Sequence, residues 1–185
     1  AVAKKYAGIG VSLVARIKNT KTPFSIDFGV GDVIVPKQEK RKIPTQLDDF
    51  TAPTVNTYSL ETTIAEKIDA ILSLMEFSSR MKDYYDIYYL ANKFDFDGAT
   101  LAEALRKTFE NRGHIFTSEQ FEQVMAFDSD ETMQKKWKAF VRKIDTKTDD
   151  YSTVLKTIKT FLIKPFAAAV VGKEFNEKWF AINGE

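Results

Sequence analysis

The chain has 185 residues, of which 44% are hydrophobic and 29% charged, and its formal net charge is +1. These values are ordinary for a globular protein of one domain or two small ones, and they give no global sign of polyanion binding. The absence of cysteine excludes disulfides and thiolate metal sites. The chain has no apolar run of membrane-spanning length and no secretion pattern at its start, so we expect a cytoplasmic protein with no membrane partner.

The first part of the chain predicts short strands. Residues 9–17 are rich in β-branched side chains, and residues 24–28 alternate apolar and polar side chains after a turn, as in a returning strand. A third strand is predicted over 33–35, where a proline ends it. Residues 37–57 are polar and contain two prolines, which predicts a long loop with one edge strand over 43–47.

From residue 58 onward the apolar period becomes helical. We predict helices over 60–75, 80–93, 100–111, 117–127, 130–144, from 150 to a kink or end at Pro165, and over 175–180. The predicted N-terminal caps are Ser59, Ser78 or Ser79, Thr100, Thr117 and Ser129, and Gly113 suits a helix end. Strands followed by helices predict an α+β protein, with a β-rich part over 1–57 and a helical part over 58–185.

Lys67 is the first candidate for chemistry, because it lies on the apolar side of its predicted helix. It follows Leu60 by seven residues and precedes Ile71 by four, so the three share one side. The polar side of the same helix carries Thr62, Glu66, Asp69 and Ser73. Lys67 either reaches water from the edge of the apolar stripe or points its ammonium into a cleft that holds phosphate.

The segment SRMKDYYD, residues 79–86, places two cations and two acids in two turns of an otherwise apolar and aromatic helix. Asp83 and Asp86 are three residues apart and share a helix face. Such a cluster costs free energy unless it is paired, and it is often a site of chemistry. The acids either form a structural ion network with Arg80, Lys82 and the earlier lysine, or one of them acts as a base or orienting group beside a cationic phosphate clamp.

Two other polar residues give weaker signals. Asp27 is a lone acid in an apolar strand, and the alternation of that strand favours a solvent-facing side chain. The nearby pair Gly29 and Gly31 is not followed by a helix, so it fails the test for a phosphate-binding glycine loop. His114 is the single histidine, which supports neither a metal cluster nor a Ser-His-Asp triad.

Basic residues concentrate in two stretches of the chain. Residues 130–164 hold nine Lys or Arg against five acids, and residues 37–42 hold four against one. Solvated surfaces usually explain such runs, and the alternative is a surface that docks a phosphate backbone.

Three blocks of sequence are similar to a known family. FSIDFGVGD (24–32), YSLETTIAEKIDAI (58–71) and SRMKDYYDIYYL (79–90) resemble, in order and spacing, the AbiEii/AbiGii-type nucleotidyltransferases. These are toxin components of abortive-infection, type IV-like toxin–antitoxin systems. The resemblance covers roughly residues 9–92, and it implies part of a polymerase-β-like nucleotidyltransferase sheet followed by a helical C-terminal bundle.

The resemblance also implies an activity and roles for individual residues. It implies transfer of a nucleoside monophosphate from a nucleoside triphosphate, with Mg²⁺, to an acceptor such as tRNA or another RNA, and a cognate antitoxin as partner. The implied roles are metal binding by Asp27, catalysis by Lys67, Asp83 and Asp86, and substrate binding by Glu61, Arg80 and Lys82. In this assignment Lys67 holds phosphate, and Asp83 orients or deprotonates.

The chain departs from the family in one respect, since it lacks the Gly-Ser…Asp-x-Asp element that begins the family's active site. Two-metal chemistry needs those paired acids. The start without Met favours a truncated chain, and we expect this polypeptide alone to be inactive or nearly so. The alternatives are a non-catalytic RNA- or antitoxin-binding module on a degenerate scaffold, and a charge cluster that only joins the helical half to the sheet.

Overall fold

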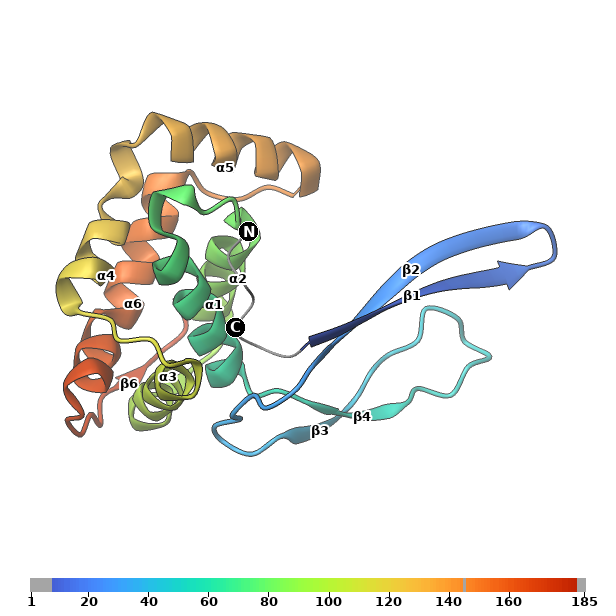
Figure 1. The fold of residues 1–185 in the computed structure, drawn as a ribbon, viewed down its shortest axis with the longest axis horizontal. Helices are drawn as coiled ribbons and strands as arrows, with labels where there is room; N and C mark the ends of the chain where they lie inside the picture. Colours follow the sequence, from blue (N-terminus) through green and yellow to red (C-terminus); the bar gives the residue numbers. More distant parts are fainter. Residues whose placement is uncertain (1–7, 145, 183–185) are drawn as a thin grey trace. The chain divides into compact units, whose positions relative to one another are not determined.

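The computed structural model describes residues 8–144 and 146–182 (Figure 1). The chain forms two compact units, Ala1–Val33 and Ile34–Glu185. The longer strands lie before residue 58 and the helices after it, which confirms the predicted α+β class. The predicted division into parts 1–57 and 58–185 follows this distribution of elements, and as a division into domains it stays a prediction.

The first unit contains an antiparallel hairpin of β1 (Gly8–Ile17) and β2 (Thr20–Gly29), as the sequence predicts. Val11 lies opposite Ile26 and Gly10 lies opposite Asp27, so the two faces differ in character. One face of the hairpin carries Ile9, Val11, Leu13, Phe24, Ile26 and Phe28. The other face carries Gly8, Gly10, Ser12, Ser25, Asp27 and Gly29.

The second unit begins with a ribbon whose strands differ from the predicted ones. β3 (Glu39–Lys42) pairs with β4 (Thr54–Thr57), and the predicted strand over 43–47 is wrong. Pairing stops at Ile43, whose N–H donates to the carbonyl of Pro53 at 2.9 Å. Proline has no N–H to offer a ladder, so the prolines at 44 and 53 confine the ladder to the residues outside them.

The predicted strand over 33–35 is also wrong, because side chains of the first helix take up its backbone groups. The Val35 N–H donates to Thr62 Oγ1 at 2.8 Å, and the Val35 carbonyl accepts from Ser59 Oγ at 2.6 Å and Thr62 Oγ1 at 2.9 Å. Ser59 Oγ also accepts from the Thr62 N–H at 3.1 Å, which confirms it as the N-cap of α1 (Leu60–Leu74). These two hydroxyls fix Val35 to the beginning of the helix.

The helical part contains six α-helices within the described residues. After α1 come a 3₁₀ turn (Met75–Phe77), α2 (Met81–Lys93), α3 (Gly98–Arg112), α4 (Ser118–Met125), a second 3₁₀ turn (Phe127–Ser129), α5 (Glu131–Ile144) and α6 (Tyr151–Val171). The predicted helix over 175–180 is wrong, since β6 (Lys178–Trp179) pairs there with β5 (Phe96–Asp97). This chain segment crosses so close to Gly98 that a Cβ atom there would lie 2.0 Å from the Glu177 carbonyl oxygen.

Several predicted helix ends are confirmed and others are displaced by nearby aspartates. Thr117 and Gln120 form the predicted capping box, and Gly113 ends α3 in the left-handed conformation. Asp97 caps α3 in place of Thr100, and the side chain of Asp130 accepts from the N–H of Met133 at the start of α5, in place of Ser129.

The predicted serine cap of the second helix and the predicted end of the last long helix at Pro165 are also wrong, whereas the alternative of a kink at Pro165 stays a prediction. No serine side chain caps the first turn of α2, where Arg80 occupies the cap position, although Ser78 Oγ accepts from the Arg80 N–H at 3.2 Å. α6 continues through Pro165 to Val171. The buried Pro165 removes one backbone hydrogen bond, and packing of the neighbouring Phe161 and Phe166 in the core maintains the helix.

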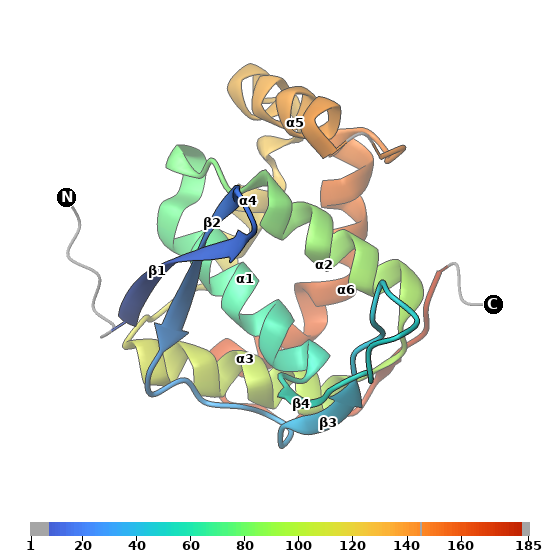
Figure 2. The ribbon, with the colours of Figure 1, turned by 90° about the vertical axis from the view of Figure 1, so that its right-hand side faces the viewer.

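The core of this unit lies among α1, α2, α3, α4 and α6. α1 packs on α3 and α2, while α6 packs on α2, α3 and α4, and α5 lies across one end of the bundle in both views (Figures 1 and 2). Fully buried core side chains include Ile64, Ile68, Ile71, Tyr84, Ile87, Leu101, Leu105, Phe121, Ile158 and Phe166. Within the described residues no helix combines the length and apolarity needed to cross a membrane.

Candidate functional site

Lys67 lies between two carboxylates of the neighbouring helix. Its Nζ is 3.1 Å from Asp83 Oδ1 and 2.6 Å from Asp86 Oδ2. α1 supplies the lysine, and α2, which packs against α1, supplies both acids from positions three apart on one face. The structure thus brings together the three side chains that the sequence predicts to be catalytic.

Burial makes this cluster unlike a surface ion pair. The side chain of Asp83 is 5% exposed, and those of Lys67 and Asp86 are 19% and 20% exposed. Burial acts to lower the pKa of Lys67, but its hydrogen bonds to Asp86 and Asp83 and their charges outweigh burial and raise that pKa above 10.5. Lys67 is therefore a fixed ammonium at neutral pH, which can attract phosphate but cannot accept a proton.

Arg80 and Lys82 complete the cluster on its solvent side. The Arg80 Nε donates to Asp83 Oδ2, and Lys82 Nζ lies 2.6 Å from Asp86 Oδ2. Arg80 is 54% exposed and Lys82 is 72% exposed, whereas their carboxylate partners are largely covered. The cluster as a whole holds three cations against two acids, and an anion approaching from solvent meets the two exposed cations first.

Glu61 lies apart from this cluster. It occupies the first turn of α1, six residues before Lys67, which places it about 120° away around the helix. Partial burial raises its pKa despite a hydrogen bond to backbone, and the nearby Glu39 carboxylate acts in the same direction. The structure therefore does not group Glu61 with Arg80 and Lys82, and its substrate-binding role stays a prediction.

Asp27 belongs to the hairpin unit, and its metal-binding role stays a prediction. Its carboxylate lies on the side of the hairpin that carries three glycines, and a Cβ atom at the opposite Gly10 would lie 3.2 Å from Asp27 Oδ1. Glycines in strand interiors often mark the close approach of a ligand or another backbone. The Asp27 carboxylate thus lies over the backbone of Gly10 on this face of the hairpin.

Few side chains in the part of the chain that the structure describes are placed to bind a metal ion. That part contains no group of three or more His, Asp or Glu side chains arranged to hold an ion. Mg²⁺ in phosphate-transfer sites is commonly held by one or two carboxylates together with substrate phosphates. Asp27, with its exposed carboxylate, fits that ligand type, whereas Asp83 and Asp86 are already occupied by cations.

The charge cluster and its surroundings lie within a region that matches a known protein family. The family described as Nucleotidyl transferase AbiEii toxin, Type IV TA system matches residues 1–170 of the 185. This chain belongs to the AbiEii family. No curated protein and no solved structure matched the chain.

Membership of the AbiEii family gives the cluster a chemical context. The family consists of nucleotidyl transferases that are toxins of type IV toxin–antitoxin systems. Its match extends well beyond residue 92, where the recognisable sequence blocks end, through most of α6. The helical part is therefore part of the family region and is not an unrelated appendage.

A second buried charge network in this AbiEii-family chain was missed by sequence reasoning. Asp69 is 2% exposed, and its carboxylate lies 2.9 Å from Arg112 Nη1 and 2.8 Å from His114 Nδ1. Arg112 also pairs with Glu66 at 3.3 Å. On the polar side of α1, Asp69 and Thr62 are both buried, because Arg112 of α3 pairs with Asp69 and Val35 hydrogen-bonds to Thr62.

This second network joins helices and lacks the geometry of a catalytic relay. Ser73 Oγ lies 3.3 Å from His114 and Asp69 Oδ1 lies 2.8 Å from it, but both contact the same ring nitrogen, Nδ1. A Ser-His-Asp relay needs the serine and the acid on different nitrogens. The sequence signals for this network were one acid inside a predicted helix, Asp69, and two basic residues near the end of another, Arg112 and His114. Such residues are too common to be specific.

Proposed function

We propose that this chain contributes to nucleotidyl transfer from a nucleoside triphosphate to an acceptor such as RNA. The observation that carries the proposal is the half-buried Lys67 held between Asp83 and Asp86, within the region matched by the AbiEii family. A solvent-facing pair of cations on the same cluster supports it, since phosphoryl chemistry depends chiefly on positioning and charge stabilisation.

In the proposed reaction the acceptor oxygen forms a bond to the α-phosphorus, and the bond from that phosphorus to the bridging oxygen breaks. Pyrophosphate leaves with the electron pair, and the acceptor proton passes to solvent. Lys67 and Arg80 would bind the phosphate oxygens. Asp83, which pairs with both, is better suited to orienting these cations than to accepting a proton.

Asp86 and Lys82 would support the same arrangement from the next turn of α2. Asp86 Oδ2 contacts both Lys67 and Lys82 at 2.6 Å, so it holds the buried lysine in place and keeps an exposed cation beside it. Asp27 would be the carboxylate that this chain offers to Mg²⁺, which neutralises phosphate charge when bound. We further propose a cognate antitoxin as protein partner and the cytoplasm as the location.

The experiment that tests this function is transfer of radiolabel from nucleoside triphosphates to bulk tRNA by the full-length protein. Lys67→Ala should slow the transfer, because about 2–4 kcal/mol of transition-state stabilisation is lost, by analogy with the loss of other charge-stabilising donors. Lys82→Ala is the matched control, because this exposed lysine contacts the same Asp86 but should cost less than tenfold. Unchanged transfer by the folded Lys67→Ala protein would remove this residue from the mechanism.

A non-catalytic module that binds RNA or the antitoxin is the second candidate. The observation in its favour is that two basic side chains of α5, Lys138 and Arg142, are exposed without an acidic partner among the described residues. Asp83→Asn separates the two readings. It should abolish transfer if the cluster is catalytic, and it should only lower the melting temperature if the cluster is structural.

A further inference from the structure

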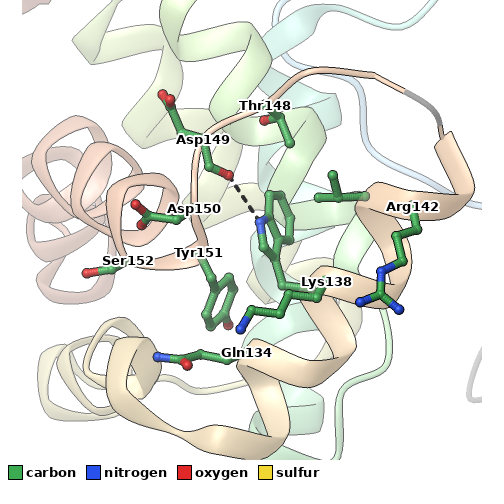
Figure 3. A pocket seen from close by; sticks show the side chains of 10 residues that line it. Gln134, Lys138, Arg142, Thr148, Asp149, Asp150, Tyr151 and Ser152 are labelled. Atoms are coloured by element: carbon green, nitrogen blue, oxygen red, sulfur yellow. Dashed lines mark hydrogen bonds between the residues drawn. The ribbon is translucent and has the colours of Figure 1, made fainter.

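A cavity of about 660 Å³ lies between α5 and the beginning of α6, away from the Lys67 cluster. Figure 3 shows Lys138 and Arg142 extending from the α5 side and Asp149, Asp150 and Tyr151 coming from the opposite side. Its volume is that of a pocket for a small molecule. The apolar part of the lining includes Trp137, whose ring centroid is 5.7 Å from that of Tyr151.

The two cations of this pocket are free while its two acids are engaged. Among the described residues neither Lys138 nor Arg142 has an ion-pair or hydrogen-bond partner. Asp149, by contrast, accepts a hydrogen bond from the Tyr88 hydroxyl through its carboxylate, and its backbone carbonyl accepts from Trp137 Nε1 at 3.1 Å. The Asp150 carboxylate accepts from the Thr153 N–H at 2.9 Å and so caps α6.

Two buried hydroxyls in the same lining have no partner of hydrogen-bonding geometry within the described residues. They belong to Thr148 and Tyr151; Tyr151 is 2% exposed, and its hydroxyl lies beside that of Tyr84, which is outside the lining. Burial, followed by the charge of Tyr84 and a hydrogen-bonding interaction with its side chain, raises the pKa of Tyr151 far above its usual range, so the Tyr151 hydroxyl stays protonated. Buried polar groups left without a partner are uncommon and call for an explanation such as a ligand.

The first turn of α6 adds a third kind of anion-binding group. α6 has 21 residues, and Asp150, Tyr151 and Ser152 at its N-terminal end all line the pocket. The Asp150 carboxylate already caps this end at the Thr153 N–H, so within the described residues the N–H groups of Tyr151 and Ser152 are the ones left for an outside anion. An ammonium, a guanidinium, the lining hydroxyls and the two remaining N–H groups together suit a phosphate group.

We propose that this pocket binds a phosphomonoester of a small molecule. The phosphate would lie against Lys138, Arg142 and the hydroxyls of Thr148 and Tyr151, and an apolar or ring part of the ligand would rest on the Trp137 side. Gln134 and Ser152 contribute less, because both already donate to Asp128. The same phosphate chemistry occurs in the backbone of RNA, so the test has to distinguish the two sources.

Trp137 provides a direct readout, because the chain contains two tryptophans and Trp179→Phe leaves it as the single reporter. Phenyl phosphate added to the full chain should change this fluorescence in a saturable way and should raise the melting temperature. Phenol, which lacks the phosphate, should do neither. Absence of a saturable response to phenyl phosphate would overturn the proposal.

Matched variants locate the site. Lys138→Ala and Arg142→Ala should each weaken phenyl phosphate binding about tenfold, as expected for a lost hydrogen bond to a charged group. Lys143→Ala, on the same helix but outside the lining, should leave binding unchanged. Equal weakening by all three would indicate a diffuse basic surface and would overturn the proposal.

The buried hydroxyl gives a second, independent test. Tyr151→Phe retains the ring and removes only the hydroxyl that lies beside Tyr84, so the folded protein should persist. Its affinity for phenyl phosphate should nevertheless fall severalfold, and an unchanged affinity would exclude the hydroxyl from the site.

Two further experiments distinguish a small phosphomonoester from RNA, and this pocket from the Lys67 cluster. A short single-stranded RNA that binds in place of phenyl phosphate, with affinity falling steeply with salt, would assign the cations to a nucleic acid and overturn the proposal. Lys67→Ala should leave phenyl phosphate binding unchanged. That result would keep this inference separate from the proposed transferase function.

Discussion

Replacement of Lys67 by Met should reveal how much the central charge cluster contributes to stability. The variant keeps most of the aliphatic stem and removes the ammonium that contacts Asp83 at 3.1 Å and Asp86 at 2.6 Å. Asp83 then retains Arg80 and Asp86 retains Lys82, so neither carboxylate is left alone. The loss of unfolding free energy should therefore be smaller than the loss of about 3–5 kcal/mol that follows when a buried charge is left without any partner.

We expect Lys67→Met to lower the free energy of unfolding by about 2 kcal/mol, the upper range for a hydrogen-bonded charged group that is partly covered. With a urea dependence of about 2 kcal/mol per molar, the midpoint of urea denaturation should fall by about 1 M. Lys82→Met is the control, because it also contacts Asp86 but is 72% exposed, and it should cost less than about 0.5 kcal/mol. Equal midpoints for Lys67→Met and wild type would refute the reasoning that this ion network stabilises the fold.

Three other changes test separate parts of the structure. The pKa of Lys67 is raised above 10.5, so the contribution of its ion pairs is complete below about pH 10 and is lost as pH rises through the raised pKa. The difference in unfolding free energy between wild type and Lys67→Met, measured in urea from pH 8 to 12, should be constant at first and shrink above pH 10.5, and growth of that difference would contradict the assignment. Arg112→Met leaves the buried Asp69 with His114 as its remaining ionisable partner and should lower the unfolding free energy by about 2–3 kcal/mol in the same assay, while a loss below about 0.5 kcal/mol would show that the pair is not structural. Gly98→Ala would place a Cβ atom 2.0 Å from the Glu177 carbonyl oxygen, so calorimetry should show a melting temperature several degrees lower, and an unchanged value would mean that the crossing segment yields without cost.

The sequence predicted the helical part well where the apolar period was strong and the caps were local. α1 begins at its predicted cap, and α4 has its predicted capping box, because both signals depend on residues within one turn. The starts of α3 and α5 were misplaced because Asp97 and Asp130 compete with nearby hydroxyl residues for the same role. Residues 175–180 were predicted to be helical because their apolar spacing is ambiguous, and contacts with Gly98 and β5 decide their structure.

The candidate site was predictable in part for a similar reason. Asp83 and Asp86 follow a local rule of helix spacing, and the position of Lys67 on an apolar stripe indicated that it would face another helix. The Asp69 network was not predictable, because it depends on the end of α3 meeting α1 across 43 residues of sequence. The pocket beside α6 was equally inaccessible, since its cations and hydroxyls come from separate segments that only packing brings together.

The attachment of Val35 has a mechanical consequence. Both hydrogen-bonding groups of its peptide backbone are held by hydroxyls at the start of α1, one residue past the beginning of the second unit. The chain that follows the hairpin unit is thus anchored at the first turn of the helix that carries Lys67, two turns further on. Shortly before this anchor, Gly31 adopts a φ of 90° that most other residues avoid, so a substitution there would strain the connection.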